Sequence, residues 1–321
     1  MPGAHRRLRH LLCFALFCGA LVASKAALAQ PRRTTVGIYV NQVSSLELKA
    51  NTFTVDFWIW FRSTGKTITP LDTFELIGAK INSKTNVIKK VLQDGQDYAA
   101  VRVNATLYRQ WDLHRYPFDD HPLEIAVEDG ELDAAKSVFV ADVQNQGMDP
   151  EIGVAGWSLD GFEHVLADHH YASNYGDTSI GVKADSRFSR YALILHARRH
   201  GSARFLKIAF PLFVAVLAAW CGFFIRPKDA GPRVAVAVGA LFAAAAATVA
   251  INSQLPEITY ATIADKTVFL TFGMIGLALI SSVLALGLHY AGREADHRRV
   301  DKVGAVLFPI VFGVLLIWVT S

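Results

Sequence analysis

Cysteine is scarce in this chain of 321 residues, which holds three of them, Cys13, Cys18 and Cys221. The first two fall in an apolar N-terminal leader, so the rest of the chain keeps Cys221 alone. One cysteine cannot form an intrachain disulfide, the bond on which many small exported domains depend. Any exported part of this chain must therefore rely on its hydrophobic core.

Acidic residues are missing from the first 29 positions, which carry four basic ones: Arg6, Arg7, Arg9 and Lys25. An apolar run over residues 11–22 follows, and Ala27-Leu28-Ala29 then has the small-residue pattern of a cleavage site. The pattern predicts a signal peptide over residues 1–29 and a mature chain from Gln30. The alternative is a membrane anchor, but the run is shorter than the roughly 20 apolar residues of a span.

Beyond the leader no charge of one sign prevails. The 32 basic residues of the whole chain, less the four of the leader, leave 28 against 28 acidic residues. A balanced chain without a basic patch gives no reason to expect a nucleic-acid partner. No nucleophile–base set, phosphate-binding loop or metalloprotease motif occurs, so we expect neither an enzyme nor a bound cofactor.

Residues 30–200 have the pattern of strands and turns. In the stretch 51–62 the side chains alternate, with one face made of five apolar residues: Phe53, Val55, Phe57, Ile59 and Phe61. Further strand-like runs cover residues 86–92, 98–107, 123–128, 137–142 and 189–196, and residues 171–182 read as a long hairpin tip. Short strands with this spacing and no helical period predict an antiparallel β-sandwich.

Residues 201–321 contain four apolar segments, at about 205–225, 233–254, 267–290 and 303–320, each long enough to span a membrane. The first connector carries Arg226, Lys228 and Arg233, and the third carries Arg293, Arg298, Arg299 and Lys302. The second connector carries only Lys266. The positive-inside rule then places the first and third connectors in the cytoplasm and both chain ends outside. The fold class is thus a membrane protein with an exported β-sandwich followed by a four-helix transmembrane domain.

The stretch 114–123 stands between the two kinds of sequence as a compact aromatic-proline turn. Pro117 restricts Tyr116, and Asp119 and Asp120 need a cationic partner, backbone donors or water. From composition alone the stretch could be an ordinary hairpin turn. Its place in the chain also suits a loop that holds one shape at a domain boundary.

These features resemble the prokaryotic members of the pentameric ligand-gated ion channels, the Cys-loop receptor superfamily. Tyr116-Pro117-Phe118-Asp119 is similar to the aromatic-Pro-Phe-Asp signature of that family, and Leu255-Pro256 to the end of its second helix. Arg199 stands twelve residues before Pro211, as does a family arginine before a proline in the first span. Where animal members carry the two loop cysteines this chain has Arg109 and Leu123, and the family's Trp-x-Pro segment lacks its tryptophan near Pro70.

The resemblance implies a homopentameric ligand-gated channel in a bacterial inner (cell) membrane, with the N-terminal domain and the C-terminus periplasmic or extracellular. Membrane lipids and inorganic ions would be its partners. Gating would be coupled through Tyr116, Pro117, Phe118, Asp119, Arg199 and Pro256. We expect Asp119 to pair with Arg199, because a charge at the domain boundary is partly desolvated and needs a counter-ion. The alternative is a static structural pair.

The second span would line the pore. Helical spacing from a start at Arg233 places these residues on one face: Ala235, Gly239, Phe242, Ala246 and Val249. A ring of Phe242 would form a hydrophobic gate. A ring of Arg233 would favour anions, and Asp229 would favour cations, so ion choice leans only slightly to anions or weak selectivity. The small residues could equally form a helix-packing face, which would make the protein a poorly conducting membrane-anchored sensor.

The ligand site implied by the resemblance lies between subunits. One side would offer Phe74, Tyr171 and Tyr175, and the neighbour would offer Trp58, Trp60, Arg62 and Arg102. Aromatic rings would hold an amine and arginines a carboxylate, so an amine, an amino acid, an organic acid or protons remain candidate ligands. The tryptophans could instead be interface packing without a ligand.

Histidines and acids gather at Glu163, His164, Asp168, His169 and His170, where a divalent metal or a proton could bind. Adjacent histidines on a loop are more often solvated, so no metal ligand is assigned.

Overall fold

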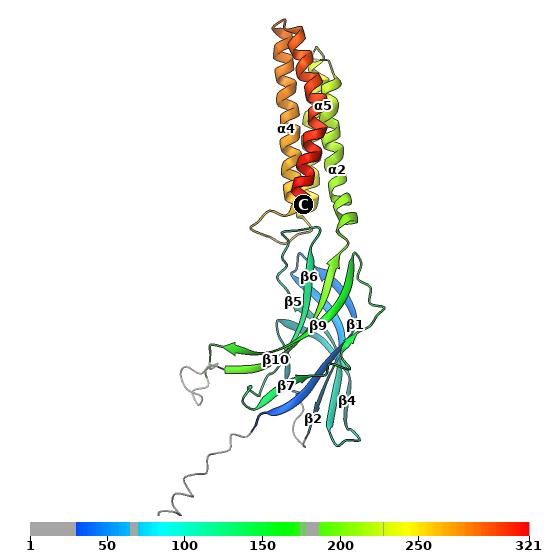
Figure 1. Cartoon of the computed structure of the whole chain (residues 1–321), viewed down its shortest axis with the longest axis vertical. Coiled ribbons are helices and arrows are strands. Elements are labelled where there is room, and N and C mark those ends of the chain that lie inside the picture. The colour runs from blue at the N-terminus through cyan, green and yellow to red at the C-terminus, as the bar shows by residue number, and fades with distance from the viewer. Residues whose placement is uncertain (1–29, 65–69, 174–175, 177–185, 227, 321) are drawn as a thin grey trace, which may run out of the picture.

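The computed structural model describes residues 30–64, 70–173, 176, 186–226 and 228–320. Its strands form a β domain at one end of an elongated molecule, and its helices form a bundle at the other (Figure 1). This arrangement confirms the predicted fold class. The signal peptide expected at residues 1–29 and most of the hairpin tip expected at 171–182 lie outside the described residues.

Two sheets make up the β domain in the part of the chain that is described. The strands are β1 (Arg32–Glu47), β2 (Thr52–Ser63), β3 (Phe74–Leu76), β4 (Ala79–Val91), β5 (Asp97–Tyr108), β6 (Asp120–Asp129), β7 (Ser137–Ala141), β8 (Gly147–Met148), β9 (Trp157–Tyr171) and β10 (Ser186–Arg199). One sheet has the order β4-β5-β2-β1-β7, with β8 also on β1, and the other has the order β3-β6-β10-β9.

The sandwich is not wholly antiparallel as expected, because β7 and β8 pair with β1 in parallel. The preceding strand β6 belongs to the other sheet. The chain therefore crosses between sheets before β7, and no tight hairpin forces the antiparallel direction.

Burial of the predicted apolar face of β2 builds the core. Its five alternating side chains, Phe53, Val55, Phe57, Ile59 and Phe61, are all at most 1% exposed. They lie in one hydrophobic cluster with Ile125 of β6 and Leu193 of β10, on the facing sheet. Strand β9 went unpredicted, because most of its side chains are exposed or half-buried and apolar residues do not alternate along it.

The helices follow directly on the last strand. They are α2 (Gly201–Cys221), with the short η2 (Gly222–Phe224), then α3 (Ala230–Asn252), α4 (Ile263–Tyr290) and α5 (Glu294–Thr320). Among the described residues these four α-helices are long and apolar enough to cross a membrane. The chain is thus a multi-pass membrane protein.

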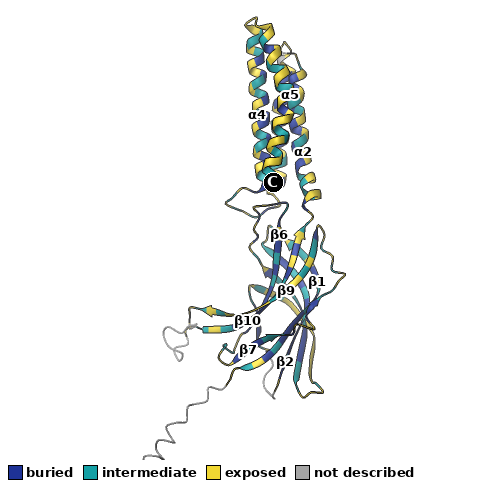
Figure 2. Cartoon of the chain, in the orientation of Figure 1, coloured by how far each residue is buried: buried dark blue, intermediate teal, exposed yellow. Residues whose placement is uncertain are grey.

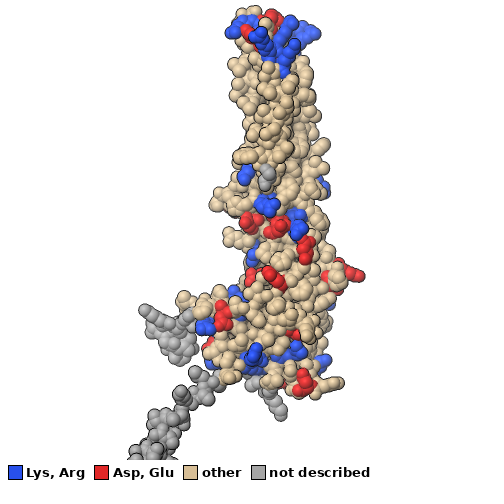
Figure 3. Space-filling model, in the orientation of Figure 1, with Lys and Arg blue, Asp and Glu red and all other residues tan. Residues whose placement is uncertain are grey.

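The helices alternate in direction, so the α3–α4 connector and the C-terminus lie beside the β domain (Figure 1). The α2–α3 and α4–α5 connectors lie at the far end, where basic side chains cap the bundle (Figure 3). Much of the outer surface of the bundle is exposed (Figure 2), and it is largely uncharged along its length. Such a surface suits lipid or neighbouring helices rather than water.

We predict that Gly37→Ala in β1 destabilises the protein, by about 1–3 kcal/mol as for other overpacked cores. A Cβ at this position would collide with the indole ring of Trp60 on the paired strand. Gly153→Ala is the matched control, since a Cβ there meets nothing within 4 Å. Thermal unfolding of the full chain in detergent measures both variants, and equal melting temperatures would contradict this account of the β1–β2 contact.

Candidate functional site at the domain boundary

The loop before β6 lies where the β domain meets the helices. Its Asp119 is 2% exposed and accepts two hydrogen bonds from the Arg199 guanidinium, Nε to Oδ1 at 2.8 Å and Nη2 to Oδ2 at 3.0 Å. The backbone N–H of Arg199 also donates to the Asp119 carbonyl at 3.3 Å. The expected pair is therefore present, with two parallel bonds in the geometry that fits a guanidinium to a carboxylate.

A histidine that sequence reasoning did not single out completes this pair. His121 Nε2 lies 2.6 Å from Asp119 Oδ2, and the side chain of His121 is 3% exposed. Its position two residues from Asp119 was the only available signal. Asp119 thus holds one guanidinium and one imidazole inside the boundary.

Aromatic rings enclose the cluster. The Arg199 guanidinium lies 3.9 Å from the centre of the Trp157 ring and 5.2 Å from that of Tyr116. The His121 ring centre lies 4.9 Å from that of Trp111. Guanidinium stacking on rings is favourable, and the rings also keep water from the ion pair.

Two opposing effects act on the Asp119 carboxyl. Burial alone would raise its pKa, but the hydrogen bonds from His121 and Arg199 outweigh burial and the pKa is lowered from 3.8. A lowered pKa means that the folded protein favours the ionised form. The ionised carboxylate therefore stabilises the folded protein above about pH 4, the pKa of a free aspartate. This stabilisation is lost as the pH falls through the lower pKa that Asp119 has in the folded protein.

The same loop touches the α3–α4 connector. The Tyr260 hydroxyl accepts a hydrogen bond from the Leu113 N–H at 2.9 Å, and its ring stacks on His114 with centres 3.7 Å apart. At the start of α4 the Ala264 N–H donates to the Tyr116 carbonyl at 3.2 Å. Motion of the loop must therefore act on the segment that joins α3 to α4.

The loop also rests on the first helix. A Cβ at Gly201 would lie 2.6 Å from the Pro117 carbonyl oxygen, so only glycine fits this approach. The Phe118 and Phe205 rings lie 5.4 Å apart, and Arg204 joins the Tyr116 hydroxyl to Gln254 near the end of α3. Pro256 lies on the connector and lines a hollow together with Leu255 and Glu257.

Helix α3 has an exposed face and a packed face, and the five residues predicted to line the pore lie on the exposed one. Ala235, Gly239, Phe242, Ala246 and Val249 are all exposed in the single chain, with Phe242 at 73%. The packed face consists instead of small side chains that are at most 3% exposed: Ala237, Ala240 and Ala244. The five residues therefore do not form the packing face against helices of the same chain.

Arg233 departs from the expectation, because it does not belong to the exposed face. It is 1% exposed, and its guanidinium holds Asp301 of α5 at 2.5 and 3.1 Å and the Ile225 carbonyl at 3.1 Å. A buried arginine neutralised by a carboxylate cannot form a free ring of positive charge. Within the chain Arg233 therefore does not offer an unpaired positive charge at the start of α3.

The residues expected to bind a ligand were assigned to two neighbouring subunits, and within one chain the two groups occupy different places in the β domain. Phe74 is a core residue, 4% exposed, with its ring 5.7 Å from that of Phe61. Trp58 is half-buried on β2, in the opposite sheet from Phe74. Tyr175 lies outside the described residues.

Both predicted arginines already have carboxylate partners. Arg62 and the Trp60 indole each donate to Asp142 Oδ2 at 2.9 Å, and Trp60 is 9% exposed. Arg102 donates to Asp56 Oδ1 at 2.8 Å. A ligand carboxylate would have to compete with these contacts, which the sequence could not reveal because the partners are distant along the chain.

A polar cluster near the β9–β10 hairpin involves the remaining predicted residue. The Tyr171 hydroxyl donates to Glu128 Oε2 at 2.9 Å, and Arg190 Nε donates to Glu128 Oε1 at 2.6 Å. Burial and the nearby Glu128 carboxylate raise the pKa of Tyr171, which keeps it a neutral donor. Nothing in the sequence around Glu128 and Arg190 indicated that these residues would contact Tyr171 or each other.

The histidine-rich stretch proves to be strand β9. Successive side chains on a strand point to opposite faces, so His169 points away from Asp168 and His170. Asp168 pairs with Arg187 at 2.6 Å, and His164 Nδ1 lies 2.9 Å from the Gln146 amide. These residues do not converge on one point.

The structure thus places a two-sheet β domain, with a buried ion pair at its boundary, directly before four apolar helices of a multi-pass membrane protein. Comparison with known proteins agrees with this class. The "Proton-gated ion channel" of Gloeobacter violaceus is 22% identical over 302 residues, covering 88% of this chain and 81% of the relative. No family model matches the chain.

Vertebrate receptor subunits are similar as well. The gamma-aminobutyric acid receptor subunit rho-1 of Rattus norvegicus is 19% identical over 234 residues, and rho-2 of Bos taurus 18% over 232. Each match covers 72% of this chain but 46% of the receptor, so the chain spans about half the length of these relatives. The chain is thus homologous to a bacterial ion channel and to subunits of the gamma-aminobutyric acid receptor, and these homologues are ion channels rather than enzymes.

We predict that Asp119→Asn and Arg199→Gln each destabilise the chain by about 3 kcal/mol, because each leaves a buried partner uncompensated. The double variant should lose clearly less than the two losses added together, which is the signature of direct coupling. Chemical unfolding of the full chain in detergent, run as a double-mutant cycle, measures this difference. Additive losses would show that the two side chains act independently.

Proposed function

We propose that the chain forms a homopentameric ligand-gated ion channel in a bacterial inner membrane. The observation that carries the proposal is the boundary itself, where one β-domain loop contacts α2, α4 and the connector between α3 and α4. A stimulus that moves the β domain would act through this loop on the end of α3. The β domain and the C-terminus would face the periplasm, since the basic connectors gather at the opposite end (Figure 3).

In this proposal α3 lines the pore. Its exposed face is made of small residues and Phe242, whereas its other face is used for packing within the chain. Five Phe242 rings around an axis would form an apolar constriction that closes by expelling water. With Arg233 neutralised by Asp301, the exposed charges before α3 are Arg226, Lys228 and Asp229, so ion choice rests on groups of both signs.

For the stimulus, a small polar ligand and protons remain two candidates. Tyr171, Glu128 and Arg190 gather near the β9–β10 hairpin and could recognise an amine, an amino acid or an organic acid. The bacterial relative is named for proton gating and the vertebrate ones for gamma-aminobutyric acid. The buried contact of His121 with Asp119 favours protons, because imidazole is the side chain that ordinarily titrates near neutral pH.

We predict that Phe242→Ala gives a leaky or easily opened channel, because it removes the apolar constriction. Planar-bilayer recordings under a chloride gradient measure both the open fraction and, from the reversal potential, the ion selectivity. Phe210→Ala on α2 is the matched control, since Phe210 is 61% exposed but lies on another helix. Equal currents from the two variants would contradict pore lining by α3.

A silent wild-type oligomer that still binds a ligand would instead identify a poorly conducting, membrane-anchored sensor. The same recordings, run beside a ligand-binding measurement on the same preparation, separate the two functions.

We further predict that His121→Gln weakens any activation of current by protons, because it removes the imidazole that contacts Asp119 inside the boundary. Glutamine retains a hydrogen-bond donor but has no proton-accepting nitrogen, and Asp119, with its lowered pKa, stays ionised near neutral pH. Around His121 lie Asp119 and Arg199, and the adjoining hollow holds Asp120, Asp160, Glu163, His196 and Arg198. His196→Gln is the control, because His196 lies on the exposed side of the same hollow. A pH response that survives His121→Gln unchanged excludes His121 as the sensor.

A further inference from the structure

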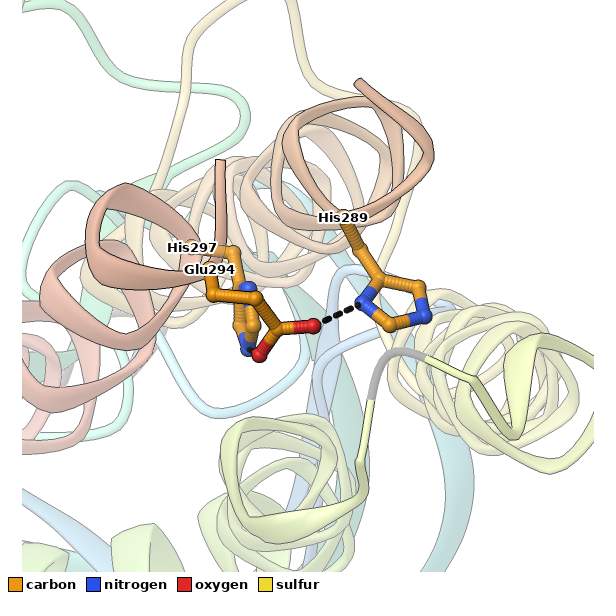
Figure 4. A group of neighbouring side chains, drawn as sticks. All are labelled: His289, Glu294 and His297. Carbon is orange, nitrogen blue, oxygen red and sulfur yellow. Dashed lines mark ion pairs between the residues drawn. The ribbon is translucent and has the colours of Figure 1, made fainter. Parts of the chain in front are cut away.

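Two histidines and a glutamate meet at the far end of the helix bundle, away from the domain boundary. His289 comes from the last turn of α4, and Glu294 and His297 come from the first turn of α5 (Figure 4). Among the residues that the structure describes, this is the group whose side chains could together hold a metal ion.

The geometry is close to that of a metal site. His289 Nδ1 lies 3.3 Å from Glu294 Oε1, and His297 Nε2 lies 4.0 Å from Glu294 Oε2. The candidate ligand atoms all lie within 4.8 Å of one another. Tetrahedral zinc with bonds of about 2.0–2.2 Å holds its ligand atoms roughly 3.4 Å apart, so small side-chain rotations would close the site.

The His289 Nδ1 atom is also poised for a ligand. The Nδ1 atoms of His289 and His297 are both buried and have no hydrogen-bond partner, and His297 is only 6% exposed. A buried polar atom without a partner is costly, and coordination would satisfy the His289 atom directly. Binding through His297 Nε2 leaves its Nδ1 facing the interior as before.

We propose that His289, Glu294 and His297 bind one zinc-like divalent transition metal ion per subunit. Two imidazoles and one carboxylate, with a fourth position left to water, are a common ligand set for zinc. Magnesium and calcium prefer oxygen ligands alone and fit this set poorly.

The turn between the helices prepares the site. Gly292 has a φ of +73°, which favours glycine, and the Arg293 N–H donates to the Leu288 carbonyl at 2.9 Å. This tight reversal sets the end of α4 against the start of α5. Glu294 and His297 are three residues apart and so share one face of α5.

Basic side chains around the site would compete with a metal ion for the Glu294 carboxylate and so lower the affinity for the metal. It opens into a hollow of about 580 Å³ whose lining includes four basic side chains: Arg226, Lys228, Arg298 and Lys302. Arg298 is the closest competitor, with Nη2 at 3.5 Å from Glu294 Oε2. Because Arg298 is 70% exposed, it can move into solvent when a metal ion takes the carboxylate.

The site adjoins the base of α3. Asp301, one helical turn after His297 on α5, is the residue that holds Arg233 at the start of α3. A metal ion that fixes the α4–α5 turn would therefore also steady this anchor. Binding of the metal does not rest on the proposed channel function.

Zinc titration of the metal-stripped full chain in detergent, followed by calorimetry, tests the proposal. We expect one zinc ion per subunit, and we expect His297→Ala and Glu294→Gln each to weaken binding on the order of tenfold or more. Arg298→Ala should bind zinc more tightly than the unchanged chain. The double variant His196→Ala and Glu163→Gln is the control, because it removes an exposed His–Glu pair at 3.6 Å elsewhere.

Cobalt absorption provides a second readout, since a tetrahedral site with two imidazoles gives a visible spectrum that the variants should lose. Glu294→Gln is nearly isosteric and tests the site even if His297→Ala fails to fold. Unchanged zinc binding in a His289→Ala and His297→Ala double variant, or no zinc binding by the unchanged chain, would overturn the proposal. Because binding is read directly, a chain that conducts no current could still bind zinc, so the two proposals fail separately.

Discussion

The carboxylate of Asp119 is removed from water at the junction of two domains, and it is tolerable there only because Arg199 and His121 meet it. Asp119 immediately precedes β6, and Arg199 is the last residue of β10, directly before α2 begins at Gly201. The ion pair therefore fixes where the helix bundle starts relative to the sandwich. The close approach of Pro117 to Gly201 and the stacking of Tyr260 on His114 lie at the same boundary and fit that placement.

The sequence predicted those features that depend on neighbouring residues along the chain. The alternation in β2 follows from burying one face, and the four spans follow from their length and apolar character. The partner of Asp119 was predictable because the family resemblance placed Arg199 at the same domain boundary, where a desolvated charge needs a counter-ion. The partners of Arg62, Arg102 and Arg233 were not, because a carboxylate brought close only by the tertiary fold leaves no local signal. Strand β9 escaped because neither face is consistently buried.

Charge in the helical part is confined to its two ends. At the near end Arg204 connects Tyr116 to Gln254, and at the far end Arg233 connects the start of α3 to Asp301 of α5. Between these polar contacts the helices meet through apolar side chains. Helix α3 is thus held in direction-specific contacts at both ends and by nonspecific packing in the middle.

The packed face of α3 consists of alanines at Ala237, Ala240 and Ala244. Alanine has no rotamers to rearrange and raises almost no ridge on the helix surface, so this face offers little interlocking with its neighbours. Sliding or tilting of the helix would then cost few broken contacts in its middle. Resistance to such a shear therefore comes from the polar contacts at the two ends of α3. One end lies beside the β domain, and the other is held by Asp301 of α5.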